Sequence, residues 1–579
     1  MRPLRTMGHT ALATLLALPL ILAAQVGSPQ PAAASDNGLA LRPAMGWSSW
    51  SFVRRWPTEA KIKAQADALV SSGLKDHGYV YVNLDDFYQK CDANGFVVDQ
   101  YGRWAVDQAT FPSGIKALAD YIHAKGLKFG FYVTPGIAKN AVTQNTPVEG
   151  TPYRARDIAD TTRQEKNYNC KNMYYLDYSK PGAQEFVNSW ARQFADWGVD
   201  YLKIDGVGSH DIPDVRAWDK ALRASGRPIT YALSNNLNIA DAPTWRQLAN
   251  SWRTQGDVEC YCGPGSNGSG FPLTSWAKIT SRFGSASAWQ PYAGPGGWND
   301  LDSLQIGNGD QVGLTADQRR SHLTLWAMAA SPLLIGTDLT ALTATDTAML
   351  ANDRLIAVNQ DGVAARRIVD ATPRQVWAKR QPGGDHIVAL FNTGTSGNQT
   401  VSVTWSQIGL TGPATLTDLW SGQSAGQSAT GFSATLRPGE TRLIRVTPGS
   451  GGSVRYEAEG ARYTAGSTVD SNHGGFSGTG FVNTPNAAGA YVEWSVASPV
   501  ARTATLTFRY ANGTTADRPM DVSVNGSVVA AGRSFGPTGA WTGWTDVTLT
   551  VPLTAGTNTI RTTATTGNGA PNLDHLEVG

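Results

Sequence analysis

The feature of this sequence that most constrains its fold is an alternation of short apolar runs with amphipathic helical patterns, from Ala44 to about Ser331. One helical pattern, for example, places Ile62, Ala66 and Leu69 on a single face. Such alternation is typical of a parallel sheet with helices packed outside it, and at this length a closed (β/α)8 barrel is the simplest solution. The predicted strands lie near Met45, at Tyr79–Leu84, Lys128–Val133, Val199–Ile204, Ile229–Leu233 and Ser251–Arg253, near Trp298, and at Pro332–Ile335; predicted helices between them include Gly114–Lys125, Pro181–Trp197, Val215–Ala224 and Ala316–Ala329.

The pattern changes after about Val358, where helical periodicity disappears and Thr- and Val-rich alternation begins. This predicts a small antiparallel β domain. A Gly/Ser linker follows, and then a second stretch of strand pattern predicts a C-terminal β-sandwich of jelly-roll type. The predicted division is 35–361 for the barrel, 362–448 for the antiparallel β domain, 449–453 for the linker and 454–579 for the β-sandwich.

The first 34 residues have the pattern of a secretory signal peptide. Arg2 and Arg5 precede the apolar segment Ala11–Ala24, and small residues follow up to Ala34. The apolar segment is shorter than the roughly 20 residues of a membrane span, and no later segment reaches that length. We therefore expect residues 1–34 to be removed and the mature protein to be soluble, secreted and extracellular.

Charge and composition narrow the function. The 48 Lys and Arg residues against 46 Asp and Glu residues give a formal net charge of +2, and the sequence has no basic run. Nucleic acid and membrane surfaces are therefore not expected as partners, because both would need a basic patch. A charged fraction of 16% with 19 Trp residues suits a secreted carbohydrate-active protein.

The four cysteines are Cys91, Cys170, Cys260 and Cys262. An even number in an exported protein indicates disulfides, for which three pairings exist. We favour Cys91–Cys170 and Cys260–Cys262, because the first two follow neighbouring predicted strands. A metal site is the alternative, although no His is nearby in sequence.

Carboxylates occur where several predicted strands end. They lie in the clusters Asn83–Asp86, Lys203–Asp205 and Trp252–Asp257. In a parallel barrel these ends meet at one face, and paired carboxylates on different strands suit glycoside hydrolysis. Lys203 and Asp205 share a face of their strand, so the ammonium would keep Asp205 ionised and ready as a nucleophile.

Seven blocks of the sequence resemble glycoside hydrolase family 27, in the family's order. They are Ala44–Trp50, Tyr81–Asp86, Tyr201–Gly206, Trp252–Asp257, Gly294–Asp300, Ser331–Leu339 and Ile356–Asp361. The resemblance implies a retaining exo-α-galactosidase with no cofactor for catalysis, on a (β/α)8 barrel followed by an antiparallel β domain.

Site roles follow from the same resemblance. It implies that Asp205 is the nucleophile and Asp257 the acid/base, that Trp47 stacks on the sugar, and that Asp85 and Asp86 hold the 4- and 6-hydroxyls. The further substrate-binding positions that it implies are Lys203, Ser234, Arg253 and Asp300. Ionised acceptors select an axial 4-hydroxyl well, because a sugar without it would leave them buried and unpaired.

The exact sugar stays open. Ser234 stands where α-galactosidases of the family usually have Cys or Glu, and this smaller side chain leaves open a bulkier group at C2, as in an α-N-acetylgalactosaminidase. Ser303 stands where a Met is frequent in the family. β-L-Arabinopyranosidases and isomalto-dextranases belong to the same family; the presence of both Asp85 and Asp86 favours galactose, as in galactomannan side chains. A catalytically inert carbohydrate-binding protein is the alternative from another class, and the two predicted catalytic carboxylates speak against it.

The C-terminal unit opens with Tyr456–Glu459 and closes with Asn572–Val578, and it resembles carbohydrate-binding module family 35. The resemblance implies a structural calcium ion with Glu457, Glu459 and Asp574 as ligands, which fits the preference of calcium for carboxylate oxygens. The alternative is that these carboxylates lie on a solvated strand edge. Candidate platforms for sugar stacking, which could equally belong to the core, are Trp541 and Trp544.

Overall fold

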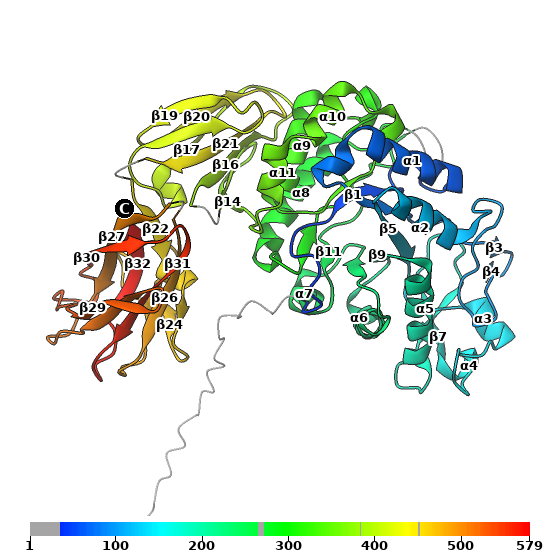
Figure 1. Cartoon of the computed structure of the whole chain (residues 1–579), viewed down its shortest axis with the longest axis horizontal. Helices are drawn as coiled ribbons and strands as arrows, with labels where there is room; N and C mark the ends of the chain where they lie inside the picture. Colours follow the sequence, from blue (N-terminus) through cyan, green and yellow to red (C-terminus); the bar gives the residue numbers. More distant parts are fainter. Residues whose placement is uncertain (1–34, 264–270, 382–383, 450–451, 499) are drawn as a thin grey trace, which may run out of the picture.

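The computed structural model describes residues 35–579 except for 264–270, 382–383, 450–451 and 499. The predicted signal peptide, residues 1–34, and two residues of the predicted linker lie outside the described residues. The chain forms three consecutive bodies, of which the second lies between the other two (Figure 1). Among the helices described, none is both long enough and apolar enough to cross a bilayer.

The first body is a barrel of eight parallel strands. Neighbouring strands follow the order of the chain, and the last strand returns to pair with the first, with Gly46 opposite Leu334. A parallel bridge between Leu304 and Ile335 joins the other edge. The strands are β1 (Met45–Ser48), β2 (Tyr81–Asn83), β5 (Lys128–Val133), β9 (Tyr201–Ile204), β10 (Thr230–Leu233), β11 (Ser251–Arg253), β12 (Trp298–Asp300) and β13 (Leu333–Ile335). The predicted (β/α)8 barrel is confirmed.

Helices between the strands cover the outside of the barrel (Figure 1). They are α1 (Glu59–Ser71), α2 (Gly114–Ala124), α5 (Ala183–Trp197), α6 (Ile212–Ala224), α7 (Ala242–Leu248), α8 (Trp276–Trp289) and α9 (Ala316–Met328), followed by α10 (Ala344–Leu350) and α11 (Asp353–Asn359). Helix α5 ends at Gly198, which has the left-handed backbone that glycine adopts at low cost (φ 83°). Its Phe194 is buried and stacks on Trp218 of α6 at a centroid distance of 6.0 Å, so the apolar faces of neighbouring helices meet.

An insertion that the sequence pattern did not reveal separates β5 from α5. It contains the three-stranded sheet β6 (Ile137–Ala138), β7 (Ala159–Glu165) and β8 (Met173–Leu176), with the short helices α3 (Lys139–Gln144) and α4 (Ala155–Ile158). The Cys91–Cys170 disulfide joins it to the hairpin of β3 (Cys91–Asp92) and β4 (Gly95–Phe96). Tyr168, which lies between β7 and β8, brings the insertion to the C-terminal ends of the barrel strands, where it lines a cavity with Asp205 and Asp257.

The second body is antiparallel, as predicted. Its six-stranded sheet has the order β14-β15-β16-β21-β18-β19, and β17 pairs with β20. The strands are β14 (Arg366–Ala371), β15 (Arg374–Arg380), β16 (His386–Asn392), β17 (Gln399–Thr404), β18 (Ala414–Asp418), β19 (Ser424–Ser428), β20 (Gly431–Leu436) and β21 (Thr441–Pro448). Phe283 of α8 packs edge-on against Phe391 of β16 at 4.9 Å, so this body shares apolar contacts with the barrel.

The third body is the predicted β-sandwich. One sheet has the order β24-β25-β32-β27-β30 with β22 beside β32, and the other has the order β23-β26-β31-β28-β29. The strands are β22 (Val454–Glu457), β23 (Arg462–Tyr463), β24 (Thr468–Asp470), β25 (Phe481–Asn483), β26 (Tyr491–Ser498), β27 (Arg502–Ala511), β28 (Met520–Val524), β29 (Ser527–Arg533), β30 (Thr545–Leu553), β31 (Gly556–Ala564) and β32 (Asn572–Val578). The Arg380 guanidinium lies 3.7 Å from the ring centroid of Tyr456, which joins the second and third bodies.

Candidate active site

A cavity of ≈ 540 Å³ lies at the C-terminal ends of the barrel strands. Five of the residues predicted from sequence line it: Asp85, Asp86, Lys203, Asp205 and Asp257. They follow or end β2, β9 and β11, whose carboxyl ends meet at one face because the strands are parallel. The structure therefore brings together side chains that are up to 172 residues apart in sequence.

Lys203 is the cation on the nucleophile side of this cavity. Its Nζ lies 2.8 Å from Asp85 Oδ2, because the long side chain reaches across to the end of β2. Burial opposes the charge of Lys203, but Asp85 and Asp205 together raise its pKa. Burial raises the pKa of Asp85, although Lys203 counteracts it. Tyr132 Oη donates to Asp205 Oδ2 at 3.3 Å, which leaves Oδ1 of the predicted nucleophile for another contact.

Asp86 has a buried carboxylate oxygen at this cavity that no described residue contacts by a hydrogen bond. Its Oδ1 accepts from the backbone N–H of Phe87 at 2.8 Å, whereas Oδ2 is buried without a hydrogen-bond partner in the described chain. Burial raises the pKa of Asp86 to about 7. A buried oxygen without a partner favours a ligand that offers a hydroxyl, because the hydrogen bond would remove its desolvation cost.

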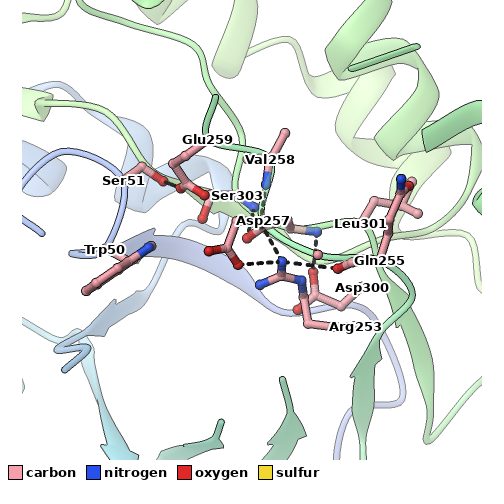
Figure 2. Close-up of polar contacts among 12 residues, drawn as sticks. Trp50, Ser51, Arg253, Gln255, Asp257, Val258, Glu259, Asp300, Leu301 and Ser303 are labelled. Atoms are coloured by element: carbon pink, nitrogen blue, oxygen red, sulfur yellow. Dashed lines mark hydrogen bonds and ion pairs between the residues drawn. The ribbon is translucent and has the colours of Figure 1, made fainter. Parts of the chain in front are cut away.

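Arg253 organises the acid/base side (Figure 2). Its Nη2 lies 3.2 Å from Asp257 Oδ1 and 2.7 Å from Asp302 Oδ2. Burial acts against ionisation of Asp257, but Arg253 and then the Tyr261 hydroxyl outweigh it and hold the pKa of Asp257 below its ordinary value. Asp257 is therefore ionised in this arrangement, which is the state of a general base.

Glu259 lies behind Asp257 and away from the cavity. It is fully buried, and the Ser51 hydroxyl donates to its Oε1 (Figure 2). Burial and the neighbouring carboxylates Asp302 and Asp257 raise the pKa of Glu259. Neither Glu259 nor Asp302 was assigned a role from sequence, although Asp302 is the closer acidic partner of Arg253.

The predicted stacking role of Trp47 is wrong. Trp47 lies inside β1 with 0% exposure, its Nε1 donates to the Thr337 carbonyl at 2.8 Å, and it does not line the cavity. Trp50, three residues later, is half-buried and does line it, beside Phe87 at a ring distance of 6.0 Å. Because β1 ends at Ser48, the following turn carries Trp50 and not Trp47 to the cavity.

Three further candidates lie one layer deeper. Ser234, Asp300 and Ser303 are buried and line a small cavity of ≈ 30 Å³ that shares Asp85 and Lys203 with the larger one. Asn235, the residue after Ser234, lines the larger cavity, and sequence reasoning did not single it out. The other lining residues that sequence reasoning missed are Trp50, Arg54, Arg55, Phe87, Tyr132, Tyr168, Gly256 and Tyr261.

The predicted calcium ligands of the third body lie close together. Ser477 Oγ donates to Glu457 Oε2 at 2.7 Å, and the Ser477 N–H donates to Asp574 Oδ1 at 2.9 Å. Asp574 also faces Arg509, whose Nε is 3.0 Å from Oδ2. Glu459 Oε2 is buried without a hydrogen-bond partner in the described residues. The two glutamates thus fit a cation, whereas Asp574 already has a positively charged neighbour.

Both favoured disulfides are confirmed. Cys91 is bonded to Cys170, and Cys260 is bonded to Cys262. The first lies beside the insertion, and the second lies in the loop after β11 that carries the predicted acid/base. The cysteines are therefore structural, and the alternative of a cysteine metal site is excluded for this arrangement.

Comparison with known proteins assigns the class of protein: the chain is a glycoside hydrolase. The family model described as Alpha galactosidase A matches residues 43–160 and 172–361, and the model of the α-galactosidase C-terminal β-sandwich domain matches residues 371–446. The chain belongs to the α-galactosidase family, glycoside hydrolase family 27. Residues 457–579 match carbohydrate-binding module family 6, so the expected resemblance to family 35 is not confirmed.

Three relatives illustrate this membership. The α-galactosidase of Oryza sativa subsp. japonica is 34% identical over 423 residues, which are 72% of this chain and 87% of that protein. The β-L-arabinopyranosidase of Geobacillus stearothermophilus, solved with arabinose, superposes with a TM-score of 0.66 at 30% identity, covering 72% of this chain and all of that one. α-Galactosidase I from Mortierella vinacea gives a TM-score of 0.55 at 28% identity, with the same coverage.

Proposed function

We propose that this protein is a retaining exo-glycosidase that removes terminal α-D-galactosyl residues, with Asp205 as the nucleophile and Asp257 as the acid/base. The observation that carries the proposal is that these two carboxylates follow different strands and line one cavity. Their environments differ, because Asp205 has a single described hydrogen bond from Tyr132 whereas Asp257 accepts from Arg253 and Tyr261. Two carboxylates in unlike environments are the means by which retaining glycosidases divide the chemistry.

In the first step, Asp205 attacks the anomeric carbon and the bond to the leaving oxygen breaks. Asp257, protonated at this stage, gives its proton to that oxygen, so that the aglycone departs as a neutral alcohol. The free oxygen of Asp205 is Oδ1, since Oδ2 accepts from Tyr132. The result is a covalent galactosyl ester on Asp205.

In the second step, Asp257 takes a proton from water and the water oxygen attacks the anomeric carbon. The ester bond to Asp205 breaks, galactose leaves with its configuration retained, and Asp257 again carries the proton. Arg253, at 3.2 Å from Asp257 Oδ1, stabilises the ionised form that accepts the proton from water. Lys203 stabilises the carboxylate of Asp205 when it is released, although its contact is with Asp85.

Recognition of galactose rests on Asp85 and Asp86. Both are buried at the cavity wall, and Asp86 Oδ2 has no described partner. A substrate hydroxyl would satisfy Asp86 Oδ2, whereas a sugar lacking that hydroxyl would leave this buried acceptor unpaired, at a cost of about 1–3 kcal/mol. Asp85 already accepts from the Asp86 N–H and from Lys203, and its oxygens can accept from the second hydroxyl as well. Trp50, half-buried at the same cavity, offers an apolar face for the sugar ring.

The test is release of nitrophenol from p-nitrophenyl α-D-galactopyranoside. Asp205→Ala and Asp257→Ala should each lose activity by at least about a thousandfold. Added azide distinguishes the two roles. In the Asp205 variant, azide attacks the anomeric carbon in place of the missing carboxylate and gives a β-galactosyl azide. In the Asp257 variant, azide attacks the ester on Asp205 and gives an α-galactosyl azide. Asp120→Ala, which removes an exposed carboxylate on α2, is the control and should keep full activity. Unchanged turnover in either active-site variant would refute the proposal.

A second candidate, β-L-arabinopyranosidase, is favoured by the higher TM-score to the Geobacillus stearothermophilus enzyme, 0.66 against 0.55 for the Mortierella vinacea α-galactosidase. Arabinopyranose is galactose without its C6 arm, so the same carboxylates could bind both sugars. The ratio of kcat/KM for the two nitrophenyl glycosides decides between them. Asp86→Asn should reduce turnover of the galactoside more than that of the arabinopyranoside if Asp86 binds the 6-hydroxyl.

We further propose that the enzyme acts outside the cell on plant polysaccharide or oligosaccharide. The signal-like residues 1–34 and the two disulfides support secretion, and the family 6 module supports attachment to a polymer. Attachment would raise the local concentration of substrate side chains. Detection of the mature protein in culture medium, with an N-terminus near Ser35, tests the first part.

For the third body we propose a calcium ion held by Glu457 and Glu459, with Asp574 nearby. The unpartnered buried oxygen of Glu459 supports the site, and burial raises the pKa of Glu457, as expected for a carboxylate without a strong cation. The bound ion would tie the start of the sandwich to the segment around Ser477. Calcium content of the protein after dialysis, for wild type and Glu459→Gln, tests the assignment.

A further inference from the structure

Tyr261 has an unusual position in the loop that follows β11. It lies four residues after Asp257, and its two chain neighbours, Cys260 and Cys262, are bonded to each other. The disulfide therefore closes a small covalent ring that contains the backbone of Tyr261. Its backbone is left-handed (φ 48°), a conformation that is unfavourable for a tyrosine and persists only where the surroundings hold it.

The hydroxyl of Tyr261 has a fixed direction of donation. It lies 2.8 Å from Trp50 Nε1 and 2.5 Å from Asp257 Oδ2. An indole N–H can only donate, so the Tyr261 oxygen accepts from Trp50 and its single proton points to Asp257. The ring is further held by the Arg54 guanidinium, 5.0 Å from its centroid.

Asp257 consequently accepts hydrogen bonds at both oxygens, from Tyr261 at Oδ2 and from Arg253 at Oδ1. Such an arrangement favours the ionised carboxylate, which accepts at both oxygens and has no proton to donate. Burial and the nearby carboxylates raise the pKa of Tyr261, so the phenol keeps the proton that it donates. The charged and titratable groups that surround Asp257 are Tyr168, Lys203, Arg253, Glu259, Tyr261, Lys278, Arg282 and Asp302.

We propose that Tyr261 is a positioning residue for Asp257, whose hydroxyl holds this carboxylate in the proton-accepting form, and that the Cys260–Cys262 disulfide keeps the hydroxyl in place. The proposal rests on the role of Asp257 given under Proposed function. In the second step of the reaction, the hydrogen bond favours the base that deprotonates water. In the first step, Asp257 is protonated and the same hydrogen bond is weaker, because its acceptor then carries no charge.

The decisive experiment is the pH dependence of kcat/KM for Tyr261→Phe with the nitrophenyl galactoside. Loss of the donor makes ionisation of Asp257 less favourable, so the alkaline limb, on which free enzyme loses the proton of Asp257, should move to higher pH. We expect a shift of about one pH unit, which is about tenfold in rate at a pH on that limb. Tyr121→Phe is the matched control, because it removes an exposed hydroxyl that donates to Asp67 and should leave the limb in place.

The part played by the disulfide is tested by Cys260→Ser combined with Cys262→Ser. This variant should shift the limb in the same direction as Tyr261→Phe, and adding it to Tyr261→Phe should cause no further shift. Mild reductant should likewise shift the wild type and leave Tyr261→Phe unaffected, which provides a second measurement if the double variant folds poorly. Cys91→Ser combined with Cys170→Ser controls for disulfide loss in general.

Two outcomes would overturn the proposal. If Tyr261→Phe lowers activity by the same factor at every pH, Tyr261 is structural and does not act through Asp257. If Tyr261→Phe shifts the limb but neither cysteine replacement nor reductant does, the disulfide has no part in holding the hydroxyl. Failure of the proposed function is seen separately, as absence of an α-galactosyl azide product with Asp257→Ala.

Discussion

The carboxylates of the barrel cavity and those of the third body are close-set in both places, but their charges are balanced differently. In the barrel, Lys203 lies 2.8 Å from Asp85 and Arg253 lies 3.2 Å from Asp257. In the third body, Glu459 has no ion pair with any cation in the described chain, and its Oε2 has no hydrogen bond. Side chains of the protein thus supply the positive charge in one cluster and leave it incomplete in the other.

This difference indicates what each cluster can do. Carboxylates that are paired with fixed cations keep their charge in a buried site and can exchange protons with a substrate. Carboxylates without enough cations need a proton or a metal ion, and oxygen-rich clusters suit calcium. The barrel cluster therefore suits catalysis without a metal, whereas the third-body cluster suits a structural ion.

The largest effect should follow from breaking the balance in the barrel. Lys203→Met leaves the buried Asp85 and the half-buried Asp205 without their cation, and removal of one partner from a buried pair costs about 3–5 kcal/mol. We expect a large fall in the midpoint of chemical unfolding and a fall in kcat/KM of at least about a hundredfold. Lys116→Met, which breaks an exposed pair with Asp120, should change stability by less than about 1 kcal/mol. Equal effects of the two substitutions would contradict this account of the barrel.

Asp86 lines the cavity and is buried by more than nine-tenths, and the effect of replacing it should depend on pH. Its pKa is raised by burial to about 7 in the folded protein from 3.8. The folded state therefore binds this proton more tightly than the unfolded state does, and the associated stability is present below about pH 4 and lost as the pH rises to about 7. Asp86→Asn should remove this pH-dependent loss of unfolding free energy, which is on the order of 4 kcal/mol at most. The Tm of the variant should therefore rise above that of the wild type as the pH increases from 4 to 7.

Asp214 provides the matched control for this pH effect. It is fully buried with a pKa that burial raises to about 7, but its hydrogen bond comes from Tyr178 and it does not line the cavity. Asp214→Asn should reproduce the pH-dependent gain in Tm and keep kcat/KM, whereas Asp86→Asn should lose activity. If both variants lose activity alike, Asp86 has no special role in binding the sugar.

Removal of calcium should affect the carboxylate cluster of the third body and not that of the barrel. Chelation should lower the Tm of the third body. The free energy of unfolding should fall by about 2.7 kcal/mol if calcium had been present at a hundred times its Kd. The barrel holds no such ion in our proposal, so activity on the small nitrophenyl substrate should not change. Glu459→Gln should abolish the effect of chelation. Loss of small-substrate activity on chelation would show that the barrel, too, depends on a metal.

Much of the site could be predicted from the sequence, because two simple rules determine it. Apolar runs define the strands, and parallel strands place their carboxyl ends at one face, which brought Asp85, Asp205 and Asp257 together. The pairing of cysteines also followed from neighbouring strands. These inferences depend on the backbone and on strand order, both of which the pattern encodes.

Side-chain direction and reach could not be predicted in the same way. Trp47 and Trp50 lie in one short motif, and only the end of β1 at Ser48 decides which ring enters the core and which reaches the cavity. Lys203 shares a strand face with Asp205, yet its four-carbon stem carries the ammonium to Asp85. The insertion β6–β8 and the loop of Tyr261 lack strong periodicity, so nothing in the pattern placed them at the cavity.

The smallest effect on small-substrate turnover should come from the aromatic residues of the third body. Trp541 is half-buried, stacked on His473 with centroids 6.2 Å apart, while Trp544 donates from Nε1 to the Gly474 carbonyl at 3.0 Å and packs near Phe481. The ring of Trp541 is thus the less constrained of the two by hydrogen bonding, and Trp541→Ala should weaken binding to galactomannan by about tenfold, or 1.4 kcal/mol. Turnover of the nitrophenyl galactoside should stay at the wild-type value, since this residue belongs to a different body from the cavity. A pull-down with insoluble polysaccharide measures the binding, and the melting temperature of the variant shows whether the fold is kept. Undiminished binding by a folded variant would assign Trp541 to the core.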